Sequence, residues 1–405
     1  MSAGLPEVHL KEYYEKFYPC GSVLKWLKYN RPPSEYLELR EIAFILSDDT
    51  HIRYKVILTE EEFKKELLRT LPHKIDLGAV YNYRPDKRLL HKNDFKAMER
   101  ELVFDIDLTD YDVIRSCCTG ANICRSCWRW MALAVRVLEK ILKNHFGFRH
   151  MLFIFSGRRG VHCWVADEVA RKLDNSGRSA VAEYLSVFVG TKKVQIPDEY
   201  IHPMLEDAYN TIMEGDEFDK LVLEQKWLEE NNWSEVLSFC NDESWRSTLM
   251  REFASLKTPE MRWKLLKRRF DSNYRQKTES EGGTLPEEPP THVKNFLKQF
   301  VLQYAHPRLD VNVSTGTNHL LKSPFCVHPK TGKVAVPLNP KMIDKFNPED
   351  VPTISKLMDE LHKISSAAMA SGESKENKLD LLTKHSSLKP YLEAFESFVN
   401  GAISS

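Results

Sequence analysis

The stretch ELVFDIDLTDYD, at residues 101–112, constrains the fold of this chain more than any other part of its sequence. As a β-strand, it would carry apolar residues on one face and aspartates on the other, because successive side chains point to opposite faces. The apolar face would hold Leu102, Phe104, Ile106 and Leu108. Asp105 and Asp107 would lie side by side and repel each other, so a divalent cation between them is predicted. A half-exposed edge strand with solvated acids fits the same pattern.

Length and composition bound the class of protein. The 405 residues suffice for one large domain with an insertion, or for two to three ordinary domains. No apolar run is long enough to span a bilayer and the N-terminus lacks the apolar region of a secretory signal, so a soluble intracellular protein without a membrane partner is expected. Lys plus Arg and Asp plus Glu each number 58, so any binding of nucleic acid must be local or shared with a partner.

The first part of the chain alternates helical and extended patterns, as α/β proteins do. Helices are expected at 10–29 and after Thr59, which forms a capping box with Glu62. Strands are expected at 41–47, 51–57, 74–83 and 97–108.

The later part of the chain predicts a long helix, a change of composition and a return to the core. The helix is expected at 128–146 and two strands at 151–155 and 161–166, followed by a charged, tryptophan-containing helical stretch. Later, a helix is expected at 296–304, a strand at 307–313, a hairpin that turns at 329–332, a disordered stretch at 365–378 and a helix at 388–399. The predicted organisation is an α/β core in two parts (1–190 and 291–364), an inserted helical subdomain (191–290), and a flexible segment with a C-terminal helix (365–405).

Four of the eight cysteines cluster with the spacing CC-x5-C-x2-C between the acidic strand and the long helix. These are Cys117, Cys118, Cys124 and Cys127. Thiolates at such spacing fit a closed tetrahedral Zn²⁺ site that leaves no position for substrate, which predicts a structural role. A redox-active or merely buried group of thiols is the alternative.

Between the two short strands at 151–155 and 161–166 lies a loop reading SGRRGVH. Glycines allow a ligand to approach the backbone, and the planar guanidinium of arginine suits phosphate oxygens. The candidate phosphate-binding residues are Ser156, Arg158, Arg159 and His162. A surface turn with solvated arginines is the alternative, and the spacing of a Walker loop is absent from the chain.

The stretch from 308 to 332 repeats the acidic pattern and adds cations. As a strand, this stretch would place Leu309 and Val311 on one face and Asp310 on the other face. Asp310 could then complete a two-metal site. Lys322 and His328 could add positive charge to a triphosphate pocket, although a hairpin with polar edges fits equally.

Taken in order, these motifs closely resemble the catalytic small subunit of eukaryotic DNA primase. The resemblance covers about 40–189 and 307–337. It implies an α/β fold with a mixed-sheet primase-type catalytic core, an inserted mainly helical subdomain and a structural zinc site. One departure is Cys326, where the resemblance leads us to expect serine.

The resemblance also implies a role for each motif. Asp105, Asp107 and Asp310 would hold the catalytic Mg²⁺ or Mn²⁺, and the four clustered cysteines would hold Zn²⁺. The nucleotide contacts would be Arg53, Asp76, Ser156, Arg158, Arg159, His162, Lys322 and His328, with Asp76 near the sugar.

The function implied is DNA-templated synthesis of short RNA primers from ribonucleoside triphosphates, to initiate DNA replication. The expected partners are a single-stranded DNA template, the large primase subunit and the complex containing DNA polymerase alpha, in the nucleus. A primase-like repair or bypass polymerase that prefers deoxynucleotides is one alternative. A non-catalytic nucleic-acid-binding subunit is the other.

Overall fold

The computed structural model describes residues 5–188, 193–197, 200–370 and 385–404. The chain divides into two compact units, each described by itself below. The first comprises Met1–Asp105, Phe148–Glu183 and Leu309–Ser405, and the second Ile106–Gly147 and Tyr184–Arg308. The domain limits expected from the sequence, with a helical insertion at 191–290, stay a prediction.

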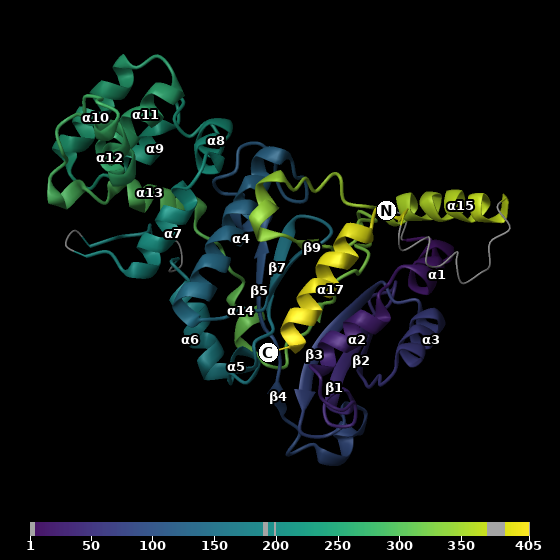
Figure 1. Ribbon diagram of the computed structural model, residues 1–405. Coiled ribbons are helices and arrows are strands. Elements are labelled where there is room, and N and C mark those ends of the chain that lie inside the picture. The colour runs from purple at the N-terminus through teal and green to yellow at the C-terminus, as the bar shows by residue number, and fades with distance from the viewer. Residues whose placement is uncertain (1–4, 189–192, 198–199, 371–384, 405) are drawn as a thin grey trace. The chain divides into compact units, whose positions relative to one another are not determined.

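The first unit contains a sheet with the strand order β2-β1-β3-β4, in which β8 also pairs with β3. Figure 1 shows β1, β2 and β3 side by side. The strands are β1 (Arg40–Ile45), β2 (His51–Lys55), β3 (Lys74–Tyr81), β4 (Ala97–Glu99) and β8 (Leu321–Lys322). All these pairs are antiparallel. β1 is buried along its whole length and β3 along all but its first residue, so these two strands form the centre of this layer.

A second sheet has the order β5-β7-β6-β9. Its strands are β5 (Leu102–Asp107), β6 (Met151–Phe155), β7 (Gly160–Val165) and β9 (Pro337–Leu338). β6 pairs antiparallel with both β7 and β9. The strands predicted at 151–155 and 161–166 are therefore confirmed, and the loop between them joins two neighbouring strands.

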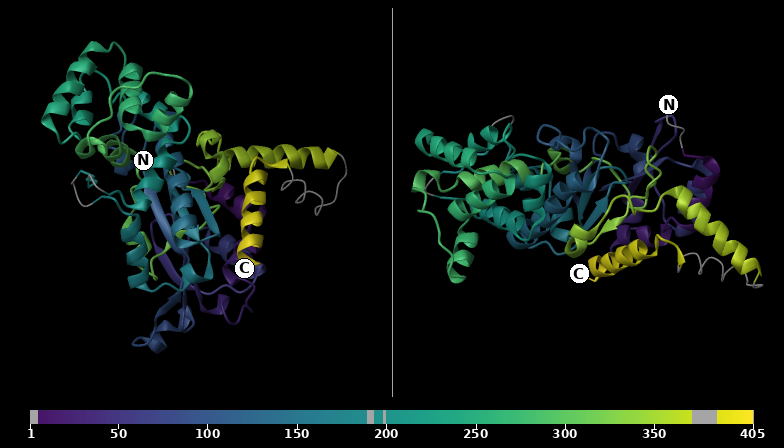
Figure 2. Two further views of the ribbon diagram at one scale, coloured as in Figure 1. Left: turned by 60° about the vertical axis from the view of Figure 1, so that its left-hand side comes forward. Right: turned by 90° about the horizontal axis from the view of Figure 1, so that it is seen from above.

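The first unit also contains helices. They are α1 (Glu7–Lys16), α2 (Cys20–Lys28), α3 (Glu60–Thr70), α5 (Glu168–Arg171), α6 (Asn175–Leu185, which ends in the second unit), α14 (Val311–Thr315), α15 (Ile354–Ala370) and α17 (Lys389–Ile403). The Thr59 hydroxyl accepts a hydrogen bond from the backbone N–H of Glu62, which confirms the predicted cap of α3. α17 packs on α2 through an edge-to-face contact between Trp26 and Phe395. Figure 2 shows this helix, in yellow, beside the purple N-terminal part of the chain.

The second unit is helical. Its helices are α4 (Arg125–Phe146), α7 (Pro203–Met213), α8 (Glu217–Glu224), α9 (Trp233–Leu237), α10 (Glu243–Ser255), α11 (Pro259–Phe270), α12 (Ser272–Ser280) and α13 (Phe296–Ala305). α4 confirms the long helix predicted there, and its apolar residues are buried. Trp130 on α4 donates a hydrogen bond to the backbone oxygen of Tyr304 at 2.7 Å, which ties α4 to the end of α13.

Four of the predicted elements were wrong. The single strand expected at 97–108 is two strands, β4 and β5, which belong to different sheets. The helix expected at 10–29 is two helices, because the chain turns at Pro19 between α1 and α2. The strand expected at 307–313 is instead a loop followed by the short helix α14. Residues 365–370, expected to be disordered, complete α15, and the rest of that segment lies outside the described residues.

A hairpin lies between β8 and β9 in the sequence. The hairpin predicted to turn at 329–332 is confirmed, since Val327 bridges Val334 and the Gly332 N–H donates to the His328 oxygen at 2.8 Å. In the described ranges, none of the helices combines the length and the apolar character that crossing a membrane requires.

Candidate active site

The acidic strand has the predicted alternation. In β5, Phe104 and Ile106 are buried, whereas Asp105 and Asp107 are partly exposed. The Asp105 carboxylate, 30% exposed, lies 3.6 Å from Nε2 of the buried His162 on β7. This is too long for a hydrogen bond but close enough for electrostatic attraction to a protonated ring.

Asp107 ends β5 and also begins the next turn. Its Oδ1 accepts hydrogen bonds from the Thr109 backbone N–H at 2.8 Å and the Thr109 hydroxyl at 2.7 Å. A carboxylate held in this way suits a hard divalent cation, which prefers oxygen ligands.

Asp310 is placed differently from the prediction but in the expected neighbourhood. It is the N-cap of α14, and its side chain accepts from the Asn312 backbone N–H at 3.0 Å. Its own backbone N–H donates to the backbone oxygen of Asp105 at 3.0 Å. The fold therefore brings Asp105 and Asp310 together from distant parts of the sequence.

The loop between β6 and β7 is a tight turn shaped by glycine. The Ser156 hydroxyl accepts from the Gly160 N–H at 3.0 Å, and Gly157 has a positive φ of 85°. A Cβ atom at Gly157 would meet the Cβ of His328 at 2.9 Å, so no other residue fits there without displacement. Arg158 and Arg159 occupy the middle of this turn, and their side chains are partly exposed.

Lys322 and His328 approach the same turn from a later segment. Lys322, on β8, donates a hydrogen bond to the backbone oxygen of Ser156. Burial lowers the pKa of Lys322, and it lowers the pKa of His328 to about 3, with Lys322 and Arg158 adding to the effect. His328 is therefore neutral at physiological pH. Its Nδ1 accepts from the Lys330 N–H at 3.2 Å, which assigns the proton to Nε2 and makes Nε2 a donor.

Asp76 lies on β3 directly opposite Lys322 in the strand register. The residue is only 9% exposed, and burial raises the pKa of its carboxyl group while Lys74 and Lys322 oppose the rise. A nearly buried carboxylate beside a lysine can accept hydrogen bonds from a ligand hydroxyl.

Arg53 is fixed by a residue that the sequence analysis missed. Its Nε and Nη2 bond the two carboxylate oxygens of Glu41 at 2.9 and 3.0 Å, and Glu41 is fully buried on β1. The Tyr81 hydroxyl donates to the same carboxylate at 3.0 Å. Glu41 thus orients Arg53, and the only signal in the sequence was an acid at the start of a predicted strand.

Arg100 was also missed. It is fully buried, and its Nη1 donates to the backbone oxygen of Gly316 at 3.1 Å in the loop that follows α14. Among the described residues, its Nε and Nη2 have no hydrogen-bond partner. Burial, together with the nearby Arg178, lowers the pKa of Arg100 to about 9.

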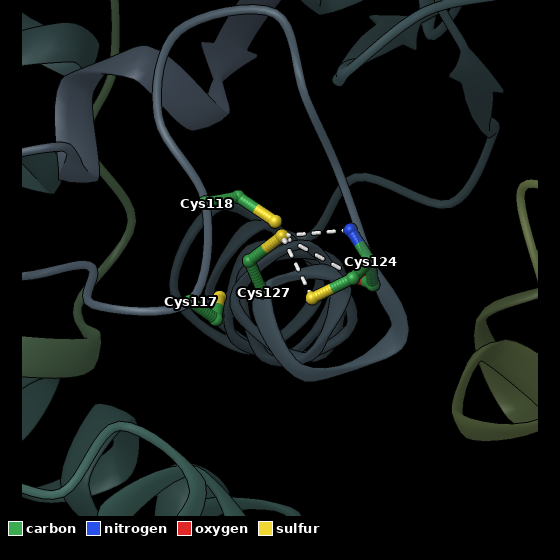
Figure 3. Close-up of side chains that lie close together, drawn as sticks. All are labelled: Cys117, Cys118, Cys124 and Cys127. Atoms are coloured by element: carbon green, nitrogen blue, oxygen red, sulfur yellow. Dashed lines mark hydrogen bonds between the residues drawn. The ribbon is translucent and has the colours of Figure 1, made fainter.

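The cysteine cluster lies in the second unit. The four sulfurs of Cys117, Cys118, Cys124 and Cys127 lie within 4.8 Å of one another, and Figure 3 shows them converging from the loop and the start of α4. The Sγ atoms of Cys124 and Cys127 are 3.8 Å apart. Zn–S bonds of about 2.3 Å in a tetrahedron require a separation of about 3.8 Å, so this spacing fits zinc.

Polar contacts support the cysteine loop from outside. The Gln225 side-chain amide donates to Sγ of Cys117 at 3.2 Å, while its oxygen accepts from the Ser116 N–H at 2.8 Å. Arg115 bonds the Asp112 carboxylate and the backbone oxygens of Gly120 and Asn122. Such outer contacts orient metal ligands, and the cluster can therefore hold a metal ion.

Known proteins resemble this chain along its length. A sequence model of the family described as DNA primase small subunit matches residues 104–340. The DNA primase small subunit of Caenorhabditis elegans is 43% identical over 409 residues, covering 100% of this chain and 99% of the relative. The proteins of that name from Schizosaccharomyces pombe and Saccharomyces cerevisiae are 35% and 30% identical, covering 96% and 97% of this chain and 88% and 91% of those relatives.

Proposed function

The chain belongs to the DNA primase small-subunit family, and from this premise we propose how its residues carry out primer synthesis. It is an enzyme, a DNA primase that acts in DNA replication. One observation carries the assignment of the site. Two residues from other segments lie against Asp105 of β5: the Asp310 N–H bonds its backbone oxygen, and the His162 ring, on the strand after the glycine turn with its two arginines, lies near its carboxylate.

We assign the catalytic metal ligands to Asp105, Asp107 and Asp310. Their oxygen atoms fit Mg²⁺ or Mn²⁺, which when bound would activate the attacking hydroxyl and neutralise charge on the triphosphate. Thr109 orients Asp107, and Asn312 orients Asp310. Each carboxylate is thereby aimed by a local hydrogen bond before any ligand arrives.

We assign the triphosphate to the turn at 156–160 and the residues that pack on it. Arg158 and Arg159 offer guanidinium groups, and His328 offers its Nε2–H as a neutral donor. Lys322 holds the turn through the Ser156 oxygen. Ser156 and His162 border the same turn, and in this assignment their hydroxyl and imidazole groups would lie beside the transferred phosphate.

We assign the ribose to Asp76, with Arg53 as a further nucleotide contact. A buried carboxylate facing a lysine is suited to accept a hydrogen bond from the 2′-hydroxyl, which deoxynucleotides lack. Arg53 keeps its position through Glu41, so the guanidinium is preorganised for a ligand.

The cysteine cluster is proposed as a structural Zn²⁺ site, because four thiolates leave no open position. The proposed partners are the large primase subunit, the complex containing DNA polymerase alpha and a single-stranded DNA template. The proposed compartment is the nucleus. A chain without net charge has little attraction of its own for a phosphate backbone, which supports the need for a partner.

The test is primer synthesis on a single-stranded DNA template with labelled ribonucleotides and Mg²⁺ or Mn²⁺. The wild type should make short RNA, and Asp105→Ala and Asp107→Ala should each abolish synthesis while remaining folded. Loss of one Lewis-acid site removes several kcal/mol of transition-state stabilisation, or about 10³-fold in rate. Retained synthesis in either variant would refute the ligand assignment.

Two further outcomes separate the alternatives. Preferential use of deoxynucleotides by the wild type would favour a repair or bypass polymerase. No synthesis by the wild type, even after the large subunit is added, would favour a nucleic-acid-binding subunit. In the variant Asp76→Ala, the preference for ribonucleotides should fall.

A further inference from the structure

The segment 82–98, which joins β3 to the end of the sheet at β4, has an unusual surface. Its seventeen residues hold five cationic side chains and two carboxylates, although the whole chain has no net charge. Four of the twelve large apolar side chains that are exposed in the described part of the chain belong to this segment: Tyr83, Leu89, Leu90 and Met98. Exposed apolar groups gathered among cations mark a binding surface.

Two pairs of aromatic rings stack face to face in this segment and at the adjoining end of β3. Tyr81 and Phe95 stack with their ring centroids 4.2 Å apart and their planes 8° from parallel. Tyr83 and His91 stack with their ring centroids 3.9 Å apart and their planes 4° from parallel. Tyr81 is buried, but Tyr83 is 37% exposed and His91 and Phe95 are partly exposed. These three rings are therefore accessible for the stacking of nucleic-acid bases, which does not depend on base sequence.

Tyr54, on the neighbouring strand β2, adds a third ring. The Arg88 guanidinium lies 3.9 Å from its centroid, which is a close cation–π contact. The backbone of Tyr54 is left-handed, with φ of 63°, and its N–H is held by Glu41 at 3.1 Å. A bulky residue in this conformation is strained, and such strain often accompanies a binding role.

Three of these rings, those of Tyr54, Tyr81 and Phe95, border a cavity of about 740 Å³ within the first unit. Tyr54, Tyr81, Phe95, Lys96 and Met98 line one part of it, and Thr317 and Asn318 line another. Several residues of this cavity stand close in the sequence to residues of the proposed active site. β4 precedes β5 and Asp105 by a few residues, and Asn318 lies between Asp310 and Lys322 in the sequence.

Most cations of this surface lack a carboxylate partner. Arg84 pairs with Glu38 and Asp86, but Lys87, Arg88, Lys92 and Lys96 make no ion pair with any residue that the structure describes. We call Tyr54, Tyr83, His91 and Phe95, together with these four cations, the aromatic–basic surface; the buried Tyr81 supports it from below. Its charge is available for phosphate groups.

We propose that the aromatic–basic surface binds single-stranded nucleic acid, and that its ligand is the DNA template strand. The bases stack on the rings while Lys92 and Lys96 contact phosphates. This inference rests on the proposed function, because it supplies the template to that active site. Exposed leucines would also suit a protein partner, but the flat ring pairs and the unpaired cations favour a nucleic acid.

The experiment measures binding of a fluorescent dT20 oligonucleotide to the full chain by anisotropy, at several salt concentrations starting near 25 mM. In Lys92→Ala/Lys96→Ala, the slope of log K against log salt should fall in magnitude by about 1.4, since each single-strand phosphate contact contributes about 0.7. Tyr83→Ala should weaken binding about 5-fold or more through loss of stacking.

Matched controls change the same residue types elsewhere. Lys11→Ala/Lys65→Ala removes two exposed lysines from α1 and α3, and Tyr200→Ala removes an exposed tyrosine from the second unit. Both should leave the affinity for dT20 and the salt slope unchanged. An oligonucleotide containing 5-iododeoxyuridine should cross-link to the peptide that contains Tyr83 or His91, as mass spectrometry would show.

The results distinguish this inference from the proposed function. Failure of the wild type to bind dT20, or wild-type binding in both surface variants, overturns the aromatic–basic surface even if primers are made. Reduced capture of a partner protein with unchanged dT20 binding also overturns it, because the surface then serves a protein. Reduced dT20 binding in the surface variants supports it even if the assignment of Asp105 and Asp107 fails.

Discussion

The cysteine cluster and the acidic site are built in opposite ways. The four cysteines come from one short stretch of chain, and their sulfurs already lie within 4.8 Å of one another. The acids come from β5 and from the N-cap of α14, far apart in the sequence, and Asp107 and Asp310 are each held by a local hydrogen bond. The proposed zinc ligands thus come from one loop and the start of one helix, whereas the fold brings the proposed catalytic ligands together from distant parts of the chain.

This difference matches the chemistry proposed for each region. A structural metal fills its coordination sphere with protein ligands, while a catalytic metal must leave positions for the reacting groups. Fixed carboxylates that do not close around an ion allow triphosphate oxygens to enter. Removing a ligand should therefore damage the fold in one region and the chemistry in the other.

The largest effect on stability is expected from Cys124→Ser. Loss of one ligand should release the metal, and because metal binding is coupled to folding, the second unit should lose several kcal/mol of stability. Metal content by mass spectrometry and unfolding in urea would measure both effects. Cys240→Ser is the matched control, since Cys240 is buried in the same unit outside the cluster. A wild type without stoichiometric metal would contradict the site.

Arg159→Ala tests the other region through its ligand. Deleting a guanidinium that contacts phosphate should weaken nucleotide binding by about 10- to 100-fold, the equivalent of a charged hydrogen bond of about 1.5–3 kcal/mol. Thermal unfolding should change little, because Arg159 lies partly exposed in a turn. Arg149→Ala removes an exposed arginine of the same unit as a control. Equal nucleotide affinity in the two variants would reject the phosphate pocket.

The stability of the second unit should depend on pH through a buried histidine. His306 is 1% exposed, and burial lowers its pKa to about 4, while the Leu185 oxygen accepts from Nε2 at 2.8 Å. The unfolded chain binds this proton near pH 6.5, so the stabilisation is complete above pH 6.5 and is lost as the pH falls toward 4. At pH 5, this loss amounts to about 2 kcal/mol.

His306→Gln keeps a donor for the Leu185 oxygen and removes the titration. Between pH 7.5 and pH 5, its stability in urea should therefore fall by about 2 kcal/mol less than that of the wild type. Measuring both with saturating metal separates this effect from acid release at the cysteines. Identical pH profiles would show that His306 does not titrate on unfolding.

The sequence predicted what depends on local patterns. The alternation in β5 placed Asp105 and Asp107 correctly on the strand, and the cysteine spacing brought four sulfurs together. The same alternation failed at Asp310. There, the side chain bonds the Asn312 N–H and starts a helix, so local capping outweighs a short apolar period.

Tertiary contacts account for what the sequence could not predict. Glu41 matters because β1 lies beside β2, where Arg53 meets it, and Arg100 matters because it reaches the oxygen of Gly316. Neither residue stands in a motif. Both became visible only when the strand order and the burial of each side chain were known.

The smallest change in stability is expected from Asp105→Asn, and this variant tests most directly how the acidic site differs from the cysteine cluster. Primer synthesis should be lost if Asp105 is catalytic as proposed. The free energy of unfolding should change by less than about 1 kcal/mol, because a partly exposed acid beside Asp107 adds repulsion as well as contacts. Asp112→Asn is the matched control. Asp112 holds the buried Arg115 and the Gly120 N–H at 2.9 Å, so its replacement should cost about 1–3 kcal/mol. Equal losses in the two variants would mean that the acid of β5 is as structural as the acid of the cysteine loop.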